Sequence, residues 1–377
     1  MSTVPTAPDQ PGAGSARPRA HAVALVEQQA RACAELGSPL YAALLDQVAL
    51  DLAAGGPCAA ALAGHEADPG PAAVALRLLG AVHALVLTGR APGLAAHYPS
   101  AGGTFDPGRP DAAWPAFRAA VAADLPWVRD WLTRPPQTNE VGRANLLIAG
   151  LLHTLAAEGS GPHPVRLFEL GSSAGLNLLA DHFRCEAPGF SYGPADSPVV
   201  LTDAWQGPPP TPSAGAAPLD FTERLGCDPI PIDPRSPDGA LALRAYLWPD
   251  QPARAARLDG ALRLAARIPT RVEAMGAAEF LRGVRVADGA LTVVWHSVMR
   301  QYVSAEEWAL VEGELDRLAD ASTAAAPFAH IAFEPRRAGE LHSFVLTVRA
   351  GRGPGRVLAE AAPHGLPART VDGRGAD

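Results

Sequence analysis

The stretch that most constrains the fold of this chain is residues 165–183. Its first part, Val165–Leu170, is a short apolar run that ends at Gly171, and this predicts a buried strand. After Gly175, leucine and phenylalanine recur at helical spacing, which predicts an amphipathic helix. A strand, a glycine turn and a helix in this order indicate an α/β protein. The turn places free backbone N–H groups at the positive end of a helix, where a protein binds an anionic or polar ligand or aims a nucleophile.

One interpretation of the turn is a cofactor site. Glu169, Gly171 and Gly175 form an E-x-G-x-x-x-G pattern that resembles motif I of the S-adenosylmethionine-dependent methyltransferases. This resemblance implies that Glu169 lies near the amino group of the cofactor and that Gly171, Ser172, Ser173 and Gly175 complete the cofactor site. Ser173 stands where that family often has a further glycine, so the match is partial.

A second interpretation is a nucleophile elbow, because Gly171–Gly175 also fits G-x-S-x-G with Ser173 as the nucleophile. Asp250 and either His330 or His364 are candidates for the rest of a hydrolase triad. The sequence before the turn contains no clear strands and no His-Gly-Gly segment for an oxyanion hole, which weakens this interpretation. A third is a structural turn without a ligand.

Composition limits the possible partners. The chain has no lysine, so a P-loop lysine and a Schiff-base lysine are excluded. The net charge is −8 and no basic stripe occurs, which makes a nucleic-acid partner unlikely in electrostatic terms. The four cysteines are widely spaced, and we expect free buried thiols and no metal site. They are Cys33, Cys58, Cys185 and Cys227.

Apolar residues make up 48% of the chain, yet no apolar run reaches the ~20 residues of a membrane span. Residues 1–19 are rich in Pro, Gly, Ser and Ala and lack the apolar centre of a signal peptide. We therefore expect a disordered tail, no membrane partner and a cytoplasmic protein.

The remaining chain divides by pattern into two parts. Residues 20–160 read as successive helices, which predicts an all-α N-terminal domain. Residues 161–377 read as an α/β domain with a Pro-rich irregular insertion at about 188–240. Further strands are expected at 271–274, 291–295 and 329–333, followed by a terminal antiparallel pair at 341–348 and 356–360. The predicted fold class is therefore α/β, a Rossmann-like, methyltransferase-type, mostly parallel sheet with a terminal antiparallel hairpin.

Several segments together resemble an uncharacterised bacterial family, a domain of unknown function. The resemblance implies a helical N-terminal region and an S-adenosylmethionine-dependent methyltransferase-like C-terminal domain, but it implies no assigned activity. The segments that carry it are Gly37–Tyr41, Ala75–Gly80, Tyr98–Ser100, Asn139–Arg143, Glu169–Asn177, Gly226–Asp228, Pro231–Asp233, Tyr246–Gln251 and Trp295–Ser297.

The carboxyl ends of the predicted strands locate the chemistry, because open α/β sheets bind ligands there. His296 and Ser297 follow a strand whose end usually faces the methyl acceptor, which makes His296 the candidate general base and Ser297 a candidate for binding the acceptor. The alternative is a hydrogen-bonded structural histidine at a strand terminus. Glu334 is expected to make local hydrogen bonds at its own strand end.

Two further groups are candidates for binding the acceptor. Arg143 lies in the helix that precedes the first strand, where helix capping by the neighbouring residues is the structural alternative. Around the insertion, Asp228, Asp233, Trp248 and Asp250 suggest a lid over the acceptor. Asp228 and Asp233 each precede a proline, which is also ordinary turn chemistry.

These observations predict a small-molecule methyltransferase that uses S-adenosylmethionine. No ribose-binding acid is identifiable, and Asp196 and Asp203 are only candidates for it. Two alternatives remain open: a non-catalytic binding or scaffold protein on the same fold, and a serine hydrolase that uses Ser173. The sequence names neither the methyl acceptor nor the oligomeric state.

Overall fold

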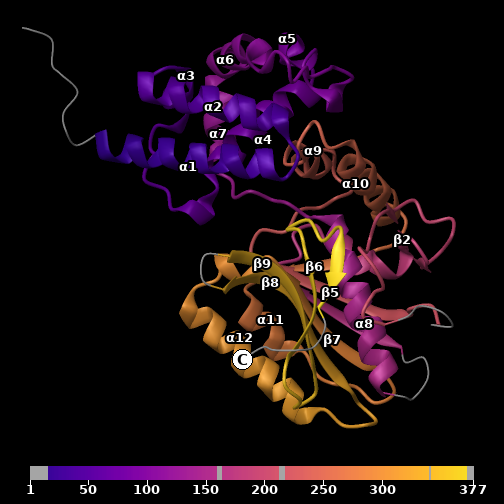
Figure 1. Ribbon diagram of the computed structural model, residues 1–377. Coiled ribbons are helices and arrows are strands. Elements are labelled where there is room, and N and C mark those ends of the chain that lie inside the picture. The colour runs from indigo at the N-terminus through magenta and orange to yellow at the C-terminus, as the bar shows by residue number, and fades with distance from the viewer. Residues whose placement is uncertain (1–15, 159–163, 212–216, 339–340, 372–377) are drawn as a thin grey trace, which may run out of the picture. The chain divides into compact units, whose positions relative to one another are not determined.

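The computed structural model describes residues 16–158, 164–211, 217–338 and 341–371 (Figure 1). The chain divides into two compact units by internal contacts. The helical unit comprises residues 1–137 and 244–252, and the sheet unit comprises residues 138–243 and 253–377. The boundary between the two units therefore lies at residue 137 and not near the predicted residue 160. The helix Ala144–Glu158, which the prediction placed in the N-terminal domain, belongs to the sheet unit. The tail expected at 1–19 lies mostly outside the described residues, and Ala16–Glu35 is already helical.

The helical unit contains seven α-helices among the described residues, as the patterning predicts. They are α1 (Ala16–Glu35), α2 (Pro39–Ala54), α3 (Pro57–Leu62), α4 (Val74–Leu87), α5 (Pro92–Ala95), α6 (Trp114–Ala123) and α7 (Leu125–Leu132). Three 3₁₀ turns join them at Gly70–Ala72, Pro99–Ala101 and Pro110–Ala113.

The ends of α2 show how local sequence sets these helices. The Ser38 hydroxyl accepts a hydrogen bond from the backbone N–H of Tyr41, and Pro39 occupies the first turn, where its missing N–H is not needed. Gly55 ends the helix in the left-handed conformation, with φ of 75°.

Residues 244–252, which we call the strap, return from the sheet unit to complete the helical unit. His83 Nδ1 lies 3.1 Å from the carbonyl oxygen of Ala245, and the Trp131 indole donates to the Tyr246 hydroxyl. Asp250 accepts hydrogen bonds from the Ser38 hydroxyl at 2.6 Å and from the N–H of Leu40 at 3.0 Å. The strap is thus an integral part of the helical unit.

The sheet unit is built on eight strands in the order β11-β10-β9-β8-β7-β1-β5-β6. The five strands β6, β5, β1, β7 and β8 are parallel, and β9, β10 and β11 follow as antiparallel neighbours. The bounds are β1 (Val165–Leu170), β5 (Phe221–Asp228), β6 (Arg271–Ala274), β7 (Leu291–Ser297), β8 (Phe328–Ala338), β9 (Leu341–Ala350), β10 (Arg356–Ala361) and β11 (Ala368–Thr370). The predicted mostly parallel α/β sheet with antiparallel C-terminal strands is confirmed.

The remaining elements of the sheet unit are helices and a small second sheet. The helices are α8 (Ala144–Glu158), α9 (Pro237–Ala245), α10 (Pro252–Ala265), α11 (Ala277–Gly283) and α12 (Ala305–Ala321), with 3₁₀ helices η4 (Val141–Arg143), η5 (Leu176–His182) and η6 (Arg300–Tyr302). The small sheet has the order β3-β2-β4, from β2 (Arg184–Ala187), β3 (Phe190–Tyr192) and β4 (Val200–Leu201).

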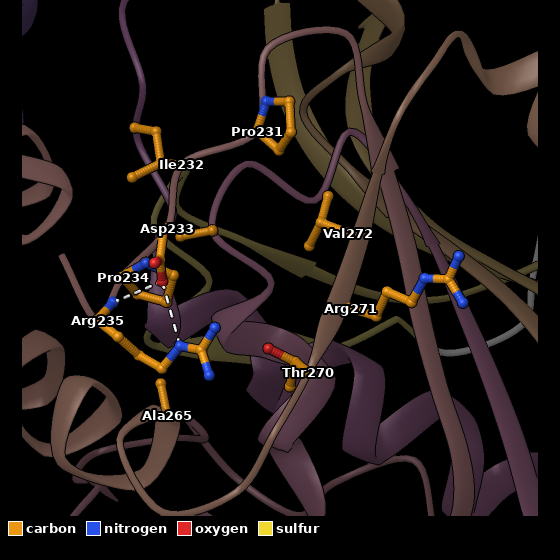
Figure 2. A pocket seen from close by; sticks show the side chains of 10 residues that line it. Pro231, Ile232, Asp233, Pro234, Arg235, Ala265, Thr270, Arg271 and Val272 are labelled. Atoms are coloured by element: carbon orange, nitrogen blue, oxygen red, sulfur yellow. Dashed lines mark hydrogen bonds and ion pairs between the residues drawn. The ribbon is translucent and has the colours of Figure 1, made fainter.

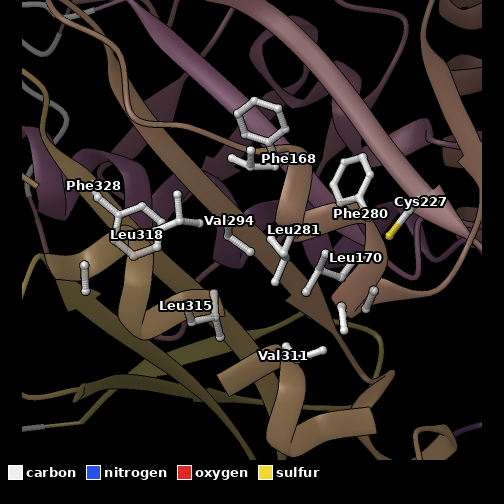
Figure 3. Close-up of a cluster of buried hydrophobic side chains, with 14 of the residues drawn as sticks. Phe168, Leu170, Cys227, Phe280, Leu281, Val294, Val311, Leu315, Leu318 and Phe328 are labelled. Carbon is white, nitrogen blue, oxygen red and sulfur yellow. The ribbon is translucent and has the colours of Figure 1, made fainter. Parts of the chain in front are cut away.

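The two faces of the large sheet follow from strand alternation. Phe168 and Leu170 of β1 point into a hydrophobic core formed with α11 and α12, which Figure 3 shows together with Val294. The opposite face meets α8, which Figure 1 draws on the other side of the sheet from α12. Gly150 allows this approach, because a Cβ atom there would lie 2.8 Å from the Ile331 side chain.

Two local predictions are corrected. The 188–240 region is not irregular throughout, because β5 forms there and pairs with β1 inside the large sheet. The turn after β1 does not open a regular amphipathic helix but the short 3₁₀ helix η5, which is interrupted at Leu179. A strong helix dipole therefore does not reinforce this turn.

In the described part of the chain, one helical stretch, Gly70–Leu87, is long and apolar enough to cross a membrane by length and composition. In the structure 67% of it is buried inside the protein, as in a core helix. This feature is weak evidence for a membrane span.

Candidate active site at the carboxyl edge of the sheet

The register of the parallel strands brings several predicted residues to one edge of the sheet. Leu170 of β1 pairs with Cys227 of β5 and with His296 of β7. The residues just beyond, Gly171 and Asp228, therefore lie side by side. Asp228 is consequently the carboxylate at the end of the strand next to β1, a place for which the sequence offered only Asp196 and Asp203 as candidates.

Hydrogen bonds hold the turn from Gly171 to Gly175 in place. The Ser173 N–H donates to Asp228 Oδ2 at 3.0 Å, and the Ser173 carbonyl accepts from the N–H of Ile232 at 3.1 Å. The Ser172 hydroxyl donates to the Glu169 carbonyl at 2.8 Å. Asp228 Oδ1 accepts a further bond from the N–H of Ile230. Both carboxylate oxygens of Asp228 are thus engaged in shaping the turn and the loop beyond it.

The two glycines of the turn approach protein side chains closely. Both have positive φ, +66° at Gly171 and +68° at Gly175. A Cβ atom at Gly171 would lie 2.9 Å from Met299 Cβ, and one at Gly175 would lie 2.9 Å from Val272 Cγ2. The atoms next to these two glycines, which the resemblance places at a cofactor, are therefore those of Met299 and Val272.

Glu169 lies beneath the turn and is 2% exposed. Its Oε1 atom accepts a hydrogen bond from the Trp295 indole at 3.2 Å, while Oε2 is buried and has no hydrogen-bond partner among the described residues. Burial raises the pKa of Glu169 to about 8, although contacts with Trp295 and Asn177 and the charge of Arg143 oppose the shift. The carboxyl is therefore mostly neutral at pH 7.

A second buried acceptor lies next to Glu169. Asn177 donates through Nδ2 to the Glu140 carbonyl at 3.4 Å, but its Oδ1 atom has no partner within the described residues. Asn139 accepts from the N–H of Leu176 through its side chain at 2.8 Å, which anchors η5. Glu169 Oε2 and Asn177 Oδ1 are thus two interior polar atoms without a hydrogen-bond partner among the described residues, and a ligand or a water molecule can supply one.

Three arginines surround the buried carboxylate of Glu140, and we call them the cationic cluster: Arg143, Arg254 and Arg257. Arg254 lies 2.7 Å from Glu140 Oε2 through both Nε and Nη2, whereas Arg257 approaches Oε1 only at 3.9 Å. Burial alone raises the pKa of Glu140, but these arginines and His364 together lower it to about 2. Glu140 is therefore ionised at neutral pH.

Arg143 connects the cationic cluster with the edge of the sheet. Its Nε donates to the Pro363 carbonyl at 3.0 Å, and its Nη1 donates to the carbonyl of Ser297 at 3.4 Å. Glu140, as N-cap, accepts from the N–H of Gly142, so capping and the predicted role of Arg143 coexist in this segment. Arg143 and Ser297, both predicted to bind the acceptor, are brought together.

His296 lies in the interior, on the face of the sheet that carries α12. Its Nδ1 is 2.8 Å from Glu334 Oε1 and its Nε2 is 3.0 Å from His330 Nε2. The ring also contacts the edge of Trp308. Because side chains alternate along a strand, His296 and Glu169 point to opposite faces. This geometry matches the structural alternative, and the role of general base stays a prediction.

The predicted lid residues are divided between the two units. Asp228 and Asp233 belong to the sheet unit, whereas Trp248 and Asp250 belong to the strap. Trp248 packs against Tyr41, with ring centroids 6.4 Å apart, and Asp250 caps the start of α2. The structure gives these two residues structural contacts inside the helical unit.

A cavity of about 350 Å³ lies beside the turn, between the loop after β5 and the start of β6 (Figure 2). Apolar side chains such as Ile232 and Val272 line it, together with Thr270. The charged groups at its rim are paired: Arg235 with Asp233, and Arg271 with Glu273. No three His, Cys, Asp or Glu side chains in the described ranges are placed to hold a metal ion.

The comparison with known families gives one clear result. A family model described as "Uncharacterized protein conserved in bacteria (DUF2332)" matches residues 23–369. The chain belongs to this DUF2332 family. No curated protein and no solved structure matches the chain.

The hydrolase interpretation of this DUF2332 chain needs a histidine side chain within hydrogen-bonding distance of the Ser173 hydroxyl. Ser173 has a left-handed φ of 53°, and its N–H is bonded to Asp228. The candidate partners have other contacts: Asp250 binds Ser38 and Leu40, and His330 stacks on His296. These contacts give the triad no support.

Sequence reasoning missed Arg254 and Arg257 as members of the site, and it considered His364 only as a candidate for a hydrolase triad. Arg254 and Arg257 are three residues apart on α10 and therefore share one helix face. The sequence shows this spacing of the two arginines directly. Its partner Glu140 lies more than 100 residues earlier, so the contact itself was not readable.

Proposed function

We propose that the sheet unit is an S-adenosylmethionine-dependent methyltransferase domain that acts on a small molecule. The observation that carries the proposal is the buried carboxyl of Glu169, with Oε2 unpartnered, directly beneath the glycine turn of the central strand β1. A buried polar atom without a hydrogen-bond partner is unfavourable unless a ligand or water supplies one. The amino group of the cofactor can be this partner once the carboxyl has given up its proton.

The sheet topology supports the same location. From β1 the chain builds outward through β5 and β6, then crosses to the other side of β1 to form β7 and β8. Strand order thus reverses next to β1, and open α/β sheets bind ligands in the crevice at such a switch point. Gly171, Ser297 and Arg143 lie at this position.

The residues present fit the amino-acid part of the cofactor. Glu169 and Asn177 would hold its ammonium group, and Glu169 would give up its proton as it pairs with that charge. When bound, the cofactor supplies an electrophilic methyl group. The protein would contribute by orienting the acceptor toward that methyl group, with Arg143 and Ser297 at the edge of the site.

The test is calorimetric titration of the full chain with S-adenosylhomocysteine at pH 7, in two buffers of different ionisation enthalpy. Since the free Glu169 carboxyl is mostly protonated, binding should release close to one proton. Glu169→Ala should abolish both the heat and the proton release, and Glu279→Ala, at an exposed position on α11, should change neither. No heat and no thermal shift at millimolar ligand would refute the proposal.

A second candidate is a non-catalytic binding or scaffold protein on the same fold. The contacts of Met299 with Gly171 and of Val272 with Gly175 favour it, because protein atoms there occupy the space that the resemblance gives to a ligand. Under this candidate, Glu169→Ala changes only stability, and S-adenosylhomocysteine does not bind.

A further inference from the structure

The cationic cluster contains more positive charge than its partners neutralise. Three guanidinium groups, from Arg143, Arg254 and Arg257, face the carboxylate of Glu140, and Glu334 adds a second negative charge near Arg143. His364 adds no charge at pH 7, because burial and the three arginines lower its pKa to about 3. One positive charge therefore remains uncompensated inside the sheet unit.

Of the three arginines, Arg257 has the weakest contact with Glu140. Arg254 holds Glu140 at 2.7 Å, and Arg143 donates to two backbone carbonyls. The Arg257 side chain is only 11% exposed, reaches Glu140 at 3.9 Å, and its buried Nε has no hydrogen-bond partner in the described residues. An almost buried guanidinium with an unpartnered Nε and only a long ion pair is unfavourable unless a further partner binds it.

We infer that the cationic cluster binds an oxyanion, a carboxylate or phosphate group of a ligand, with Arg257 as the principal donor. The planar guanidinium fork matches such groups with two parallel hydrogen bonds. The site adjoins the turn, because Asn177 hydrogen-bonds the Glu140 backbone and Arg143 contacts the end of β7. The oxyanion site does not depend on the proposed function, since any anionic ligand of this edge would use it.

The test compares thermal unfolding of the full chain in about 20 mM phosphate with chloride buffer of equal ionic strength. Phosphate should raise the Tm of the wild type and of Arg267→Met, an exposed position just beyond α10. It should raise the Tm of Arg257→Met much less, with the affinity for phosphate weakened at least about tenfold. In chloride alone, Arg257→Met should be at least as stable as the wild type, because methionine keeps much of the aliphatic stem and removes a largely buried charge whose ion pair with Glu140 is long.

Arg257→Lys provides a second variant that keeps the charge and loses the planar fork, so it should retain only part of the phosphate effect. An equal phosphate shift in the wild type and Arg257→Met would overturn the inference. A second result would also overturn the inference: phosphate does not shift the Tm of the wild type, and Arg257→Met has a lower Tm than the wild type in chloride. A purely structural arginine would behave in this way.

Two ligands distinguish the source of the anion. If Arg257→Met weakens S-adenosylhomocysteine but not 5′-methylthioadenosine, which lacks the amino-acid part, the oxyanion is the cofactor carboxylate. If it weakens neither but abolishes the phosphate effect, the oxyanion belongs to the other substrate. If S-adenosylhomocysteine does not bind the wild type, the proposed function fails while the phosphate result still decides the oxyanion site.

Discussion

Replacing Glu169 by Gln should remove a pH-dependent loss of stability from the sheet unit. The unfolded carboxyl has a pKa of 4.5 and the folded one of about 8. Between these values the folded protein keeps a proton that the unfolded chain has released, so stability falls as pH rises through this window. The penalty is absent below the lower value and complete above the higher one.

The magnitude follows from the size of this shift. Each pKa unit corresponds to about 1.4 kcal/mol, so the wild type should lose about 3 kcal/mol relative to Glu169→Gln between about pH 5.5 and pH 8.5. Glutamine keeps an acceptor for the Trp295 indole and carries no titrating proton. For a unit of this size, the loss corresponds to a relative Tm change of about 6–12 °C.

Differential scanning calorimetry of both proteins across this pH range measures the effect. Glu279→Gln, at an exposed position on α11, is the matched control and should follow the wild type at every pH. Parallel pH profiles for the wild type and Glu169→Gln would refute the reasoning, because they would mean that Glu169 titrates alike in the folded and unfolded chains.

Three further changes test other parts of the structure. Glu140→Gln should lower the free energy of unfolding by about 3–5 kcal/mol near neutral pH, because it leaves buried arginines without their carboxylate partner. Since the pKa of Glu140 is lowered from 4.5 to about 2, the wild type should lose this stabilisation as the pH falls through that range. Unfolding measured along an acid titration tests both statements. Gly80→Ala should destabilise by about 1–3 kcal/mol, since the new methyl group would lie 2.9 Å from the Tyr246 ring, whereas Gly313→Ala on α12 has open space and should be neutral or stabilising in denaturant unfolding. Ser173→Gly should be about 1 kcal/mol more stable than Ser173→Ala, because both remove the hydroxyl and only glycine relieves the φ of 53°; equal unfolding midpoints would contradict this.

The strands and helices could be predicted where the apolar residues follow a strong pattern in the sequence. The runs that became β1, β7 and β8 are apolar on both faces, as buried parallel strands require, and α12 shows a clear helical repeat. The strand β5 was not predicted from the sequence, because Glu223 and Arg224 interrupt its apolar pattern. Those charges are satisfied by Arg166 and Asp181, which a linear pattern does not show.

The helix expected after the turn was wrong for a tertiary reason. Leucines at helical spacing were present in residues 176–182, but Asn139 binds the N–H of Leu176 and Asn177 binds the Glu140 backbone. Arg224 also takes the Leu178 carbonyl. These contacts from elsewhere in the chain replace the hydrogen bonds of a regular helix.

The candidate site was readable only at its strand ends. Glu169 and Ser297 could be placed from the sheet rule, and Arg143 from its position before the first strand. The cationic cluster depends on contacts between α10 and a segment more than 100 residues earlier. In the same way, nothing in the spacing of Trp248 and Asp250 shows that they pack on α2. Long-range pairing is the information that spacing lacks.

The strap has a consequence for how this protein can be dissected and made. A fragment that ends at residue 137 would lack the nine residues 244–252 and would expose the surfaces that Ser38, Gly80 and His83 offer to them. The N-terminal helices should therefore purify well only when the strap is grafted back, through a linker or as a separate peptide. During synthesis on the ribosome they emerge first, yet they cannot finish folding until the second strand of the large sheet has been translated.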